Sequence, residues 1–472
     1  MQVSAADRSI MSKTLSGARQ RLRRVLPPLI ALAGSLVLVT SAQAQLSQEP
    51  VATAIRSAGG ASRAIRSFYA ERGGVPLWLQ DGRIGPAADR LIRLIESAPL
   101  DGLKADDYRR RQLISALERA DTGDPKALAR AEIALTRSFV ALARDMQLPP
   151  SDLDIVYPDA SVRPEVSTER ALLHAAAAAP TLDDYIQRIG WMNPLYAELR
   201  NAATAAAFSD APDGWFDTAL VRANLDRLRA LPADLGRRFV LVDAAAARLY
   251  MYQDGRVRDT MRVVVGKPSE PTPLMAARIQ FASLNPYWNL PPDLARLRVA
   301  GGVLEQGPGF VAAKRFEIMS DWSDTAHRVE PKDIDWNAVA MGRTEIRVRQ
   351  LPGPDNAMGR MKFMFPNDRG IYLHDTPEKS LLRESDRLFS SGCVRLEDAP
   401  RLGRWLFGRP LRPSTKPEQR VDLLEAVPVY ITYLTVAAEK GKLVYRSDVY
   451  GRDPRKYNQD HRSYAELRSR PG

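Results

Sequence analysis

Two residues in the last quarter of the chain have side chains that together could form and break an acyl bond. Cys393 is the single cysteine among 472 residues, and His374 lies 19 positions before it, at the end of the apolar segment IYLHDT. A thiol with a pKa of about 8.5 is mostly protonated at neutral pH, so a cysteine nucleophile needs help from a group such as a neighbouring imidazole. The pair therefore indicates thiol–imidazole catalysis, provided that the fold brings the two side chains together.

The residues around Cys393 favour this chemistry. The segment FSSGCVRLEDAP places Ser391 and Gly392 directly before the thiol and a predicted helix after it. The glycine gives the turn conformational freedom, which lets backbone N–H groups point at a developing oxyanion. We expect the positive end of the helix near Glu397 to favour the thiolate. Arg395 adds positive charge, which could act locally or bind a substrate carboxylate.

A structural interpretation of these residues stays open at this point, because a lone cysteine is most often a small buried apolar residue and a lone histidine on a strand is most often structural. His174, in an alanine-rich helix, and His461, in a charged tail, are best explained structurally, whereas His327 lies in a long insertion where it could meet substrate. The chain has no HExxH, CxxC, Walker, strand-linked GxGxxG or GxSxG motif. Zinc, nucleotide and serine-hydrolase chemistry are therefore not expected.

The N-terminus has the pattern of an export signal. Residues 1–24 carry a net charge of +5, the apolar run LIALAGSLVLV follows from Leu29, and Ala42-Gln43-Ala44 precedes Gln45. This pattern predicts a cleavable secretory signal, and the run is shorter than the about 20 apolar residues that an uncleaved anchor needs. Export also sharpens the question of the single cysteine, because an unpaired thiol in an oxidising compartment is a liability unless it is buried or used.

The rest of the chain carries a net charge of +7. This surplus favours an anionic partner such as cell-wall polymer or lipid headgroups, although a mild surplus can also serve solubility alone. The sequence contains no Lys/Arg-rich run interleaved with aromatic residues, so no nucleic-acid partner is expected.

The residue pattern changes from helical to β along the chain. The segment DPKALARAEIALTRSFVALARDMQLPP has a cap at Asp124, a proline at the first helical position and apolar residues every three or four positions, which predicts a helix. From about residue 236, β-branched and aromatic residues alternate, with a turn at Asp254-Gly255, which predicts mainly β structure. Residues 289–342 are rich in Pro, Gly and charge, and an insertion of this length is typical of a lid or binding loop.

We therefore predict an α+β multidomain protein in which an N-terminal helical scaffold is followed by a mainly β domain with a capping insertion. The predicted parts are a signal peptide at 1–44, a flexible N-terminus at 45–60, a helical scaffold at 61–200, a connector at 201–235, a β domain at 236–436 with its insertion at about 289–342, and a C-terminal extension at 437–472.

At His374 and Cys393 the sequence resembles the L,D-transpeptidase family with its YkuD-type catalytic domain. The family signature is a histidine, a spacer of comparable length and Ser/Thr-x-Gly-Cys-x-Arg/Asn, and here sixteen residues separate His374 from SGCVR, which Ser390 precedes. The segments VVVGKPSEPTP, LNPYWNLP and VPVYITYLTV…DVYGRD extend the likeness over about 237–455. The last two segments resemble in particular the large periplasmic YcbB-like subgroup, which has a helical scaffold and a capping insertion.

The resemblance implies a role for each matching residue. Cys393 would be the nucleophile and His374 its general base, with the backbone N–H groups near Gly392 and Cys393 as the oxyanion hole. The residues implied to line the site or meet substrate are Tyr372, Asp375, Ser391, Gly392, Arg395 and Trp288. Many family members have Gly or Ser where this chain has Asp375. The subgroup also usually has a peptidoglycan-binding module, for which the 201–235 connector is too short.

The resemblance implies an acyl transfer on peptidoglycan. The thiolate would attack the third residue of a tetrapeptide stem, release the terminal D-alanine and pass the acyl group to another stem as a 3→3 cross-link. Water or a lysine of a wall-attached protein could instead accept the acyl group. No metal or organic cofactor is implied, the compartment would be the periplasm, and carbapenems would be expected to trap Cys393. A wall-binding scaffold that has lost catalysis and a secreted cysteine peptidase stay as alternatives from other classes.

Overall fold

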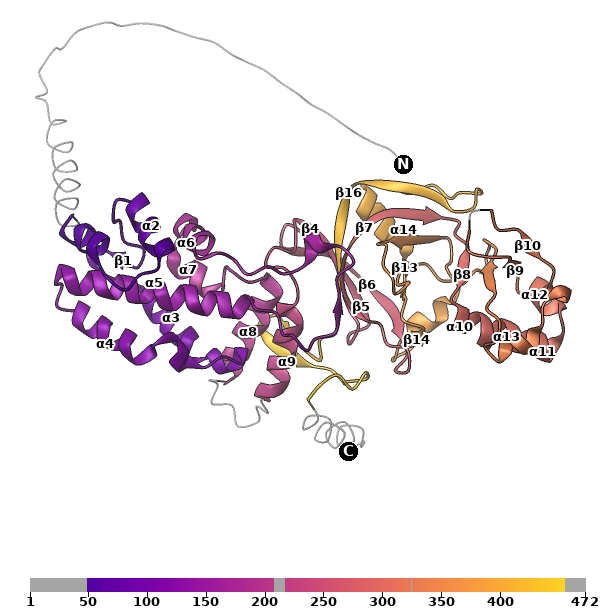
Figure 1. Ribbon diagram of the computed structural model, residues 1–472, viewed down its shortest axis with the longest axis horizontal. Coiled ribbons are helices and arrows are strands. Elements are labelled where there is room, and N and C mark those ends of the chain that lie inside the picture. The colour runs from indigo at the N-terminus through magenta and orange to yellow at the C-terminus, as the bar shows by residue number, and fades with distance from the viewer. Residues whose placement is uncertain (1–48, 208–216, 324, 455–472) are drawn as a thin grey trace, which may run out of the picture. The chain divides into compact units, whose positions relative to one another are not determined.

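A computed structural model describes residues 49–207, 217–323 and 325–454 of the chain. The predicted signal peptide at 1–44 and the second half of the predicted C-terminal extension therefore lie outside the described residues. Within the described ranges, a helical region precedes a β-rich region, as the sequence predicted (Figure 1). No helix among the described residues is long and apolar enough to cross a membrane.

The helical region is built from amphipathic helices around one apolar core. The longest helix is the one that the sequence predicted: Asp124 accepts a hydrogen bond from the Ala127 N–H and Pro125 occupies the first helical position. Both features satisfy or avoid backbone donors that a helix N-terminus leaves free. The helices of this region are one over residues 49–57, α2 (Arg63–Glu71), α3 (Pro86–Glu96), α4 (Arg110–Ala120), α5 (Pro125–Gln147), α6 (Glu169–Ala178), α7 (Leu182–Gln187) and α8 (Pro194–Ala207). Three short strands accompany them, β1 (Leu79–Gln80), β2 (Arg83–Ile84) and β3 (Ile155–Val156).

A large mixed sheet forms the β-rich region. Its strands are β4 (Arg238–Asp243), β5 (Arg248–Gln253), β6 (Arg256–Gly266), β7 (Leu274–Leu284), β12 (Met361–Met364), β13 (Leu373–His374), β14 (Leu388–Ser390), β15 (Val394–Leu396) and β16 (Gln419–Thr432). The order is β12-β13-β15-β6-β5-β4-β16-β7, and β12 also pairs with β7, so the sheet closes on itself. The predicted turn joins β5 to β6, with Asp254 and Gly255 both at positive φ. This left-handed pair is the geometry that a tight hairpin requires.

At β4 the closed sheet is buried on both faces, because residues on this strand alternate between two cores. Phe239 and Leu241 of β4 pack into the core of the helical region, whereas Val240 and Val242 belong to a second core with helix α14 (Ala399–Phe407). The short strand β3 also pairs in parallel with β7, which ties the helical region to the sheet through main-chain hydrogen bonds. The sequence did not reveal this strand, because two residues are too few to establish a pattern.

The segment that the sequence predicted as a capping insertion has its own sheet and core. Strands β8 (Trp288–Leu290), β9 (Phe316–Met319), β10 (Arg328–Val329) and β11 (Arg347–Gln350) pair in the order β10-β9-β11-β8. The helical elements are α10 (Pro292–Leu294), the π-helical segment η4 (Ala295–Ala300), α11 (Gly301–Gln306), α12 (Gly309–Ala313) and α13 (Trp336–Ala340). Leu290, Ile318 and Val348 are among the buried residues of the core beneath them. We call residues 288–350 the cap.

Two elements join the helical region to the end of the chain. Helix α9 (Thr218–Arg229) lies in the connector, and Asp217 caps it by accepting from the Leu220 N–H. The hairpin of β17 (Val436–Glu439) and β18 (Lys442–Tyr445) follows β16 and contacts both α8 and α9. Val436 and Ala437 are buried in the helical core. The chain then continues through Asp448–Asp453 back toward the large sheet.

Candidate active site

Strand register brings His374 and Cys393 to one face of the sheet. β13 runs parallel to β15, with Leu373 opposite Val394 and His374 opposite Arg395. The Val394 N–H donates to the Tyr372 carbonyl at 3.0 Å, which extends the ladder by one step. Leu373 and Val394 are fully buried in the second core. Because side chains alternate along a strand, the residues on either side of these two share the opposite face.

That opposite face carries Tyr372 and His374 from one strand and Cys393 and Arg395 from the other. His374 and Cys393 are thus diagonal neighbours, a relation within reach of long and aromatic side chains. His374 is buried, with 2% of its surface exposed, whereas Cys393 is half-buried. A shielded imidazole beside a partly accessible thiol is the arrangement that a base and its nucleophile require.

The hydrogen bond of His374 determines which ring nitrogen can act as a base. Its Nδ1 lies 2.6 Å from the Asp375 carbonyl oxygen. A carbonyl only accepts, so Nδ1 carries the proton and Nε2 keeps its lone pair. Burial, helped by the nearby Arg395 charge, lowers the pKa of His374 to about 3. The imidazole is therefore neutral near pH 7 and able to accept a proton.

Asp375 itself is clamped on both sides. One carboxylate oxygen pairs with the Lys379 ammonium at 2.7 Å, and the other accepts from the Arg360 N–H at 2.9 Å. Lys379 also donates to the carbonyls of Leu396 and Glu397 at 3.0 and 2.9 Å. Gly359, at φ +61°, makes room for the carboxylate, because a Cβ there would lie 2.6 Å from the Asp375 side chain. These contacts fix the position of Asp375, whose backbone carbonyl orients His374. Through Lys379 they also connect Asp375 to the end of β15.

The turn that carries Cys393 is fixed by hydrogen bonds from side-chain hydroxyls to its carbonyl groups. Gly392 has φ +101°, a conformation that favours glycine. The Thr272 hydroxyl donates to the Gly392 carbonyl at 2.9 Å, and the Ser390 hydroxyl donates to the Cys393 carbonyl at 2.5 Å. In a trans peptide the C=O and the following N–H point in opposite directions. The Cys393 N–H therefore points away from Thr272, which suits it to be an oxyanion donor.

The thiol of Cys393 rests in its protonated form. Its Sγ lies 3.4 Å from the Gly370 carbonyl oxygen, to which the S–H can donate. Burial raises the pKa of Cys393, while the Tyr372 backbone and the Arg395 charge lower it in part. This half-buried, protonated thiol beside a neutral imidazole must therefore be deprotonated during the reaction itself.

The helix predicted near Glu397 is present as α14, which begins at Ala399. The expectation that its positive end favours the thiolate was wrong, because strand β15 separates Cys393 from the helix and the pKa of the thiol is raised. The Asp398 carboxylate caps that helix by accepting from the Arg401 N–H, and Glu397 pairs with Arg262. The helix dipole is thus compensated by its own cap and acts only within its first turn.

Two cations flank the imidazole in a row across the sheet. Lys362 of β12 lies opposite His374, and Arg395 lies opposite it on the other side. Lys362 pairs with Glu418 at 3.0 Å and lies 5.8 Å from the centre of the Tyr372 ring, and Arg395 pairs with Glu378. Positive neighbours disfavour a second positive charge, so this row helps to keep His374 neutral.

The remaining predicted site residues divide into two groups. Ser391 is half-buried and hydrogen-bonds the Glu270 carboxylate beside the nucleophile turn. Burial raises the pKa of Tyr372, and the proximity of Cys393 and Glu418 raises it further. Trp288, by contrast, lies on β8 of the cap, where it packs against the cap core and has the Arg298 guanidinium 6.0 Å from its ring centre. The structure thus unites the predicted residues of β13 and β15, and it places Trp288 among cap residues.

Sequence reasoning missed four residues that shape the site: Lys362, Lys379, Thr272 and Tyr450. Lys362 and Lys379 are charged residues whose partners lie far along the chain or on the main chain, so no spacing reveals them. Thr272 and Tyr450 fall in the segments VVVGKPSEPTP and DVYGRD, which were quoted only for likeness. Among the residues that the structure describes, no group of three His, Cys, Asp or Glu side chains could hold a metal ion.

Comparison with known proteins defines the class of the two regions. Residues 63–202 match a scaffold domain family, and residues 237–416 match the YkuD family of L,D-transpeptidase catalytic domains. A candidate L,D-transpeptidase of Haemophilus influenzae is 28% identical over 392 residues, which cover 77% of this chain and 78% of that protein. The chain thus carries an L,D-transpeptidase catalytic domain of the YkuD type behind a scaffold domain.

This order of domains fits the arrangement of the large YcbB-like subgroup of the L,D-transpeptidases. Two solved L,D-transpeptidases each align over 43% of this chain with a TM-score of 0.21. One is from Mycobacterium smegmatis, at 14% identity, and the other is in complex with imipenem, at 15% identity. The chain spans 61% and 60% of their respective lengths.

Proposed function

We propose that this chain is a peptidoglycan L,D-transpeptidase that forms 3→3 cross-links through a thioester on Cys393. The observation that carries the proposal is the parallel register of β13 and β15. It sets the thiol diagonally beside a buried, neutral imidazole whose Nδ1 is occupied by the Asp375 carbonyl. The match of residues 237–416 to L,D-transpeptidase catalytic domains supports the substrate class.

The first half of the reaction acylates the thiol. Cys393 Sγ attacks the carbonyl carbon of the third residue of a donor tetrapeptide, and its proton moves to His374 Nε2. The Cys393 N–H, directed away from Thr272, stabilises the oxyanion of the tetrahedral intermediate. The intermediate collapses as the bond to the terminal D-alanine breaks. His374 gives its proton to the leaving amine, which departs as free D-alanine and leaves a thioester.

The second half returns the enzyme to its resting state. The amine of a diamino acid in another stem attacks the thioester carbonyl and gives a proton to His374. The carbon–sulfur bond breaks, and the imidazole returns the proton to the departing Cys393 sulfur. The products are the 3→3 cross-link and the free thiol. Because His374 is neutral at the start of each half, it can act as a base and then as an acid in both.

The setting of this reaction is part of the proposal. The N-terminal signal pattern supports export of the chain to the periplasm, where peptidoglycan stems are the acyl donors and acceptors. Lysine side chains of wall-attached proteins are alternative acceptors for the same thioester. The mature chain's positive charge suits an anionic polymer.

Mass spectrometry of the mature protein with purified disaccharide-tetrapeptide tests the proposal, with Cys393→Ala as the matched control. We expect a cross-linked dimer that has lost one D-alanine, together with an acyl-enzyme of the tripeptide mass, and neither from the variant. Tripeptide without dimer would overturn cross-linking in favour of L,D-carboxypeptidase activity or protein attachment. Unchanged substrate would remove the enzyme assignment and favour a non-catalytic wall-binding scaffold. Cleavage of unmodified L-peptides would indicate a cysteine peptidase.

A further inference from the structure

The nucleophile turn is connected to the C-terminal segment through one buried threonine. Thr272 has no exposed surface, and its hydroxyl donates to the Gly392 carbonyl at 2.9 Å while it accepts from the Gly266 N–H at 2.9 Å. The Lys267 N–H donates to the Ser390 carbonyl at 2.9 Å. The loop between β6 and β7 is thus bonded to both sides of the turn.

Tyr450 closes this loop from the other side. Its hydroxyl donates to the Gly266 carbonyl at 2.7 Å and lies 3.5 Å from the Thr272 backbone nitrogen. Arg452 donates to the Thr272 carbonyl at 3.2 Å. One tyrosine oxygen therefore bridges the two ends of a tight loop in which a Cβ at Gly266 would lie 2.2 Å from the Glu270 carbonyl.

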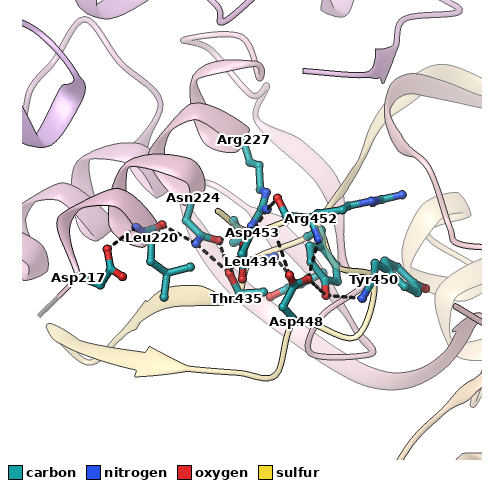
Figure 2. Close-up of polar contacts among 12 residues, drawn as sticks. Asp217, Leu220, Asn224, Arg227, Leu434, Thr435, Asp448, Tyr450, Arg452 and Asp453 are labelled. Carbon is teal, nitrogen blue, oxygen red and sulfur yellow. Dashed lines mark hydrogen bonds and ion pairs between the residues drawn. The ribbon is translucent and has the colours of Figure 1, made fainter. Parts of the chain in front are cut away.

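Residues 448–453 hold Tyr450 in place (Figure 2). The Tyr450 ring stacks on the Tyr433 ring with centroids 4.9 Å apart, and the Tyr450 backbone N–H donates to the Tyr433 hydroxyl at 3.0 Å. The Asp448 carboxylate accepts from the Tyr433 hydroxyl at 2.8 Å and from the N–H groups of Arg452 and Asp453 at 2.9 and 2.8 Å. The segment is therefore a closed turn rather than a free tail.

Helix α9 anchors this turn from the connector. Arg227 and Asp453 form an ion pair at 2.8 Å in which the side chains are 3% and 0% exposed. Arg227 also donates to the Arg452 carbonyl at 2.8 Å. Thr435 donates to Asp453 at 3.0 Å and accepts from Asn224 at 2.9 Å, as Figure 2 shows. Several hydrogen bonds among buried polar groups, as here, make a rigid support.

We infer that Tyr450 is a positioning residue for the oxyanion hole, acting through Thr272 on the peptide between Gly392 and Cys393. The inference rests on the proposed function, because it assigns to the Cys393 N–H the role of oxyanion donor. Tyr450 and Thr272 fix the plane of that peptide from its carbonyl side, and helix α9 fixes Tyr450 through Asp453. The connector thereby sets the geometry of the catalytic turn without touching substrate.

Acylation by imipenem tests this role, because a β-lactam carbonyl acylates a nucleophile without needing a second stem. In Tyr450→Phe we expect the maximal acylation rate of Cys393 to fall roughly tenfold with the half-saturating imipenem concentration nearly unchanged, since a misplaced donor weakens the transition state more than ground-state binding. Tyr430→Phe is the matched control. Tyr430 lies on β16 and its hydroxyl donates to the Leu235 carbonyl at 3.2 Å, so we expect acylation of this variant to match the wild type.

A second pair of variants separates positioning from folding. Thr272→Val keeps the shape but loses the hydroxyl, whereas Thr272→Ser keeps the hydroxyl and both of its bonds. We expect Val to slow acylation roughly a hundredfold and Ser to restore it to within about threefold of the wild type. Equal rates for Val and Ser, or a Tyr450→Phe rate equal to that of the wild type, would overturn the inference. If Tyr450→Phe fails to fold, the acylation rates of Thr272→Val and Thr272→Ser test the inference on their own.

Thiol alkylation distinguishes failure of this inference from failure of the proposed function. Wild-type protein that neither reacts with imipenem nor cross-links stems would remove the function. The pH dependence of Cys393 alkylation by iodoacetamide then decides the positioning role. Burial raises the pKa of this thiol, so loosening the turn in Tyr450→Phe should move the alkylation midpoint to lower pH. An unmoved midpoint would overturn the role of Tyr450.

Discussion

The scaffold core and the catalytic face each bury an ionisable side chain, and they differ in what they leave unused. Glu132 of α5 has no exposed surface. Its carboxylate accepts from the Tyr69 hydroxyl at 2.6 Å, from the Trp78 N–H at 3.1 Å and from the Leu77 N–H. His374 is almost as buried, but its hydrogen bond occupies only one ring nitrogen and leaves the other as an acceptor, and the strand register places the residue on the same sheet face as Cys393.

The difference shows what separates a structural site from a reactive one. A fully bonded buried group stabilises the loop or helix that supplies its partners. A buried group with spare capacity beside an accessible thiol retains the ability to exchange a proton. The two regions also differ in how buried charge is treated. Two cations beside His374 disfavour a positive charge on the imidazole, whereas in the scaffold the positive charge of Arg200 is paired with the negative charge of Asp101.

Removing the base should produce the largest effect on reactivity. His374→Gln keeps a polar side chain of similar reach but cannot accept the thiol proton, so the maximal imipenem acylation rate should fall about 10³-fold at pH 7, within the range for loss of a general base. Stopped-flow acylation with intact-mass detection measures it. A loss below about tenfold would mean that His374 is structural, like Glu132, and would remove the comparison.

The pH dependence of stability provides an independent check on His374. Its pKa is lowered to about 3, so the unfolded chain binds a proton that the folded chain excludes between roughly pH 6.5 and 3. The folded state therefore loses stability through this group as the pH falls across that window. The stability of His374→Gln should fall less steeply than that of the wild type over the same range, as measured by urea unfolding.

Breaking the scaffold ion pair should affect stability strongly and reactivity little. Arg200 contacts Asp101 at 2.8 Å with side chains 2% and 0% exposed, and Tyr196 also bonds that carboxylate. Arg200→Leu leaves a buried carboxylate without its cation, which should cost about 3–5 kcal/mol of unfolding free energy. The acylation rate per folded molecule should stay at the wild-type value.

The double variant is the control for this pair. Asp101→Asn combined with Arg200→Leu removes both charges, and the amide oxygen can still accept from Tyr196. It should recover a large part of the lost stability, because the cost of the single change lies mainly in the unpaired charge. A double variant as unstable as Arg200→Leu would mean that lost packing dominates instead. A slower acylation rate per folded molecule would show that the scaffold network reaches the active site.

Much of this architecture could be predicted from local signals. Asp124 and Pro125 mark the start of α5, and the alternation after residue 236 gives the β-rich region. The spacing of His374 and Cys393 indicates the pair whose strands the register unites. These signals work because capping and strand periodicity act over a few residues.

The rest depends on contacts that no local pattern encodes. Lys379 reaches carbonyls 17 and 18 residues away, and Tyr450 bonds Gly266 across 184 residues. The expected effect of the α14 dipole on the thiolate failed for the same reason, since strand β15, which pairs with β13 and β6, separates Cys393 from the helix. Tertiary pairing overrides local propensity in short segments.

A smaller effect should follow from changing Glu132. Burial raises the pKa of Glu132 to about 7, against an ordinary value of 4.5. The stability that this group contributes is thus fully present below about pH 4.5 and is lost as the pH rises through 7. Relative to Glu132→Gln, the wild type should lose about 2–3 kcal/mol of unfolding free energy between pH 5 and 8.

Urea unfolding at the two pH values measures this difference, and Glu118→Gln is the control because Glu118 is exposed on α4. The control should follow the wild type at both pH values. Acylation by Glu132→Gln should also match the wild type, since Glu132 has bonded partners and no role in proton transfer. Parallel pH curves for the wild type and Glu132→Gln would contradict the ionisation behaviour that the burial implies.

The smallest expected effect concerns Lys379, which orients His374 without touching it. Lys379→Met removes the cation at 2.7 Å from Asp375 and two hydrogen bonds to β15 and its end. The Asp375 carbonyl that accepts from His374 Nδ1 should then be less well fixed in position. Because the imidazole is then less well oriented, the maximal acylation rate should fall roughly five- to tenfold. The Lys379 side chain is 43% exposed, so unfolding free energy should change by less than about 1 kcal/mol.

Lys416→Met, at an exposed position of the same domain, is the control and should change neither quantity. A rate loss in Lys379→Met without loss of stability would place this clamp with the catalytic face. A loss of stability without a rate loss would instead make the clamp a structural network like that of Glu132. In that case the residues that support catalysis would be limited to the immediate neighbours of His374.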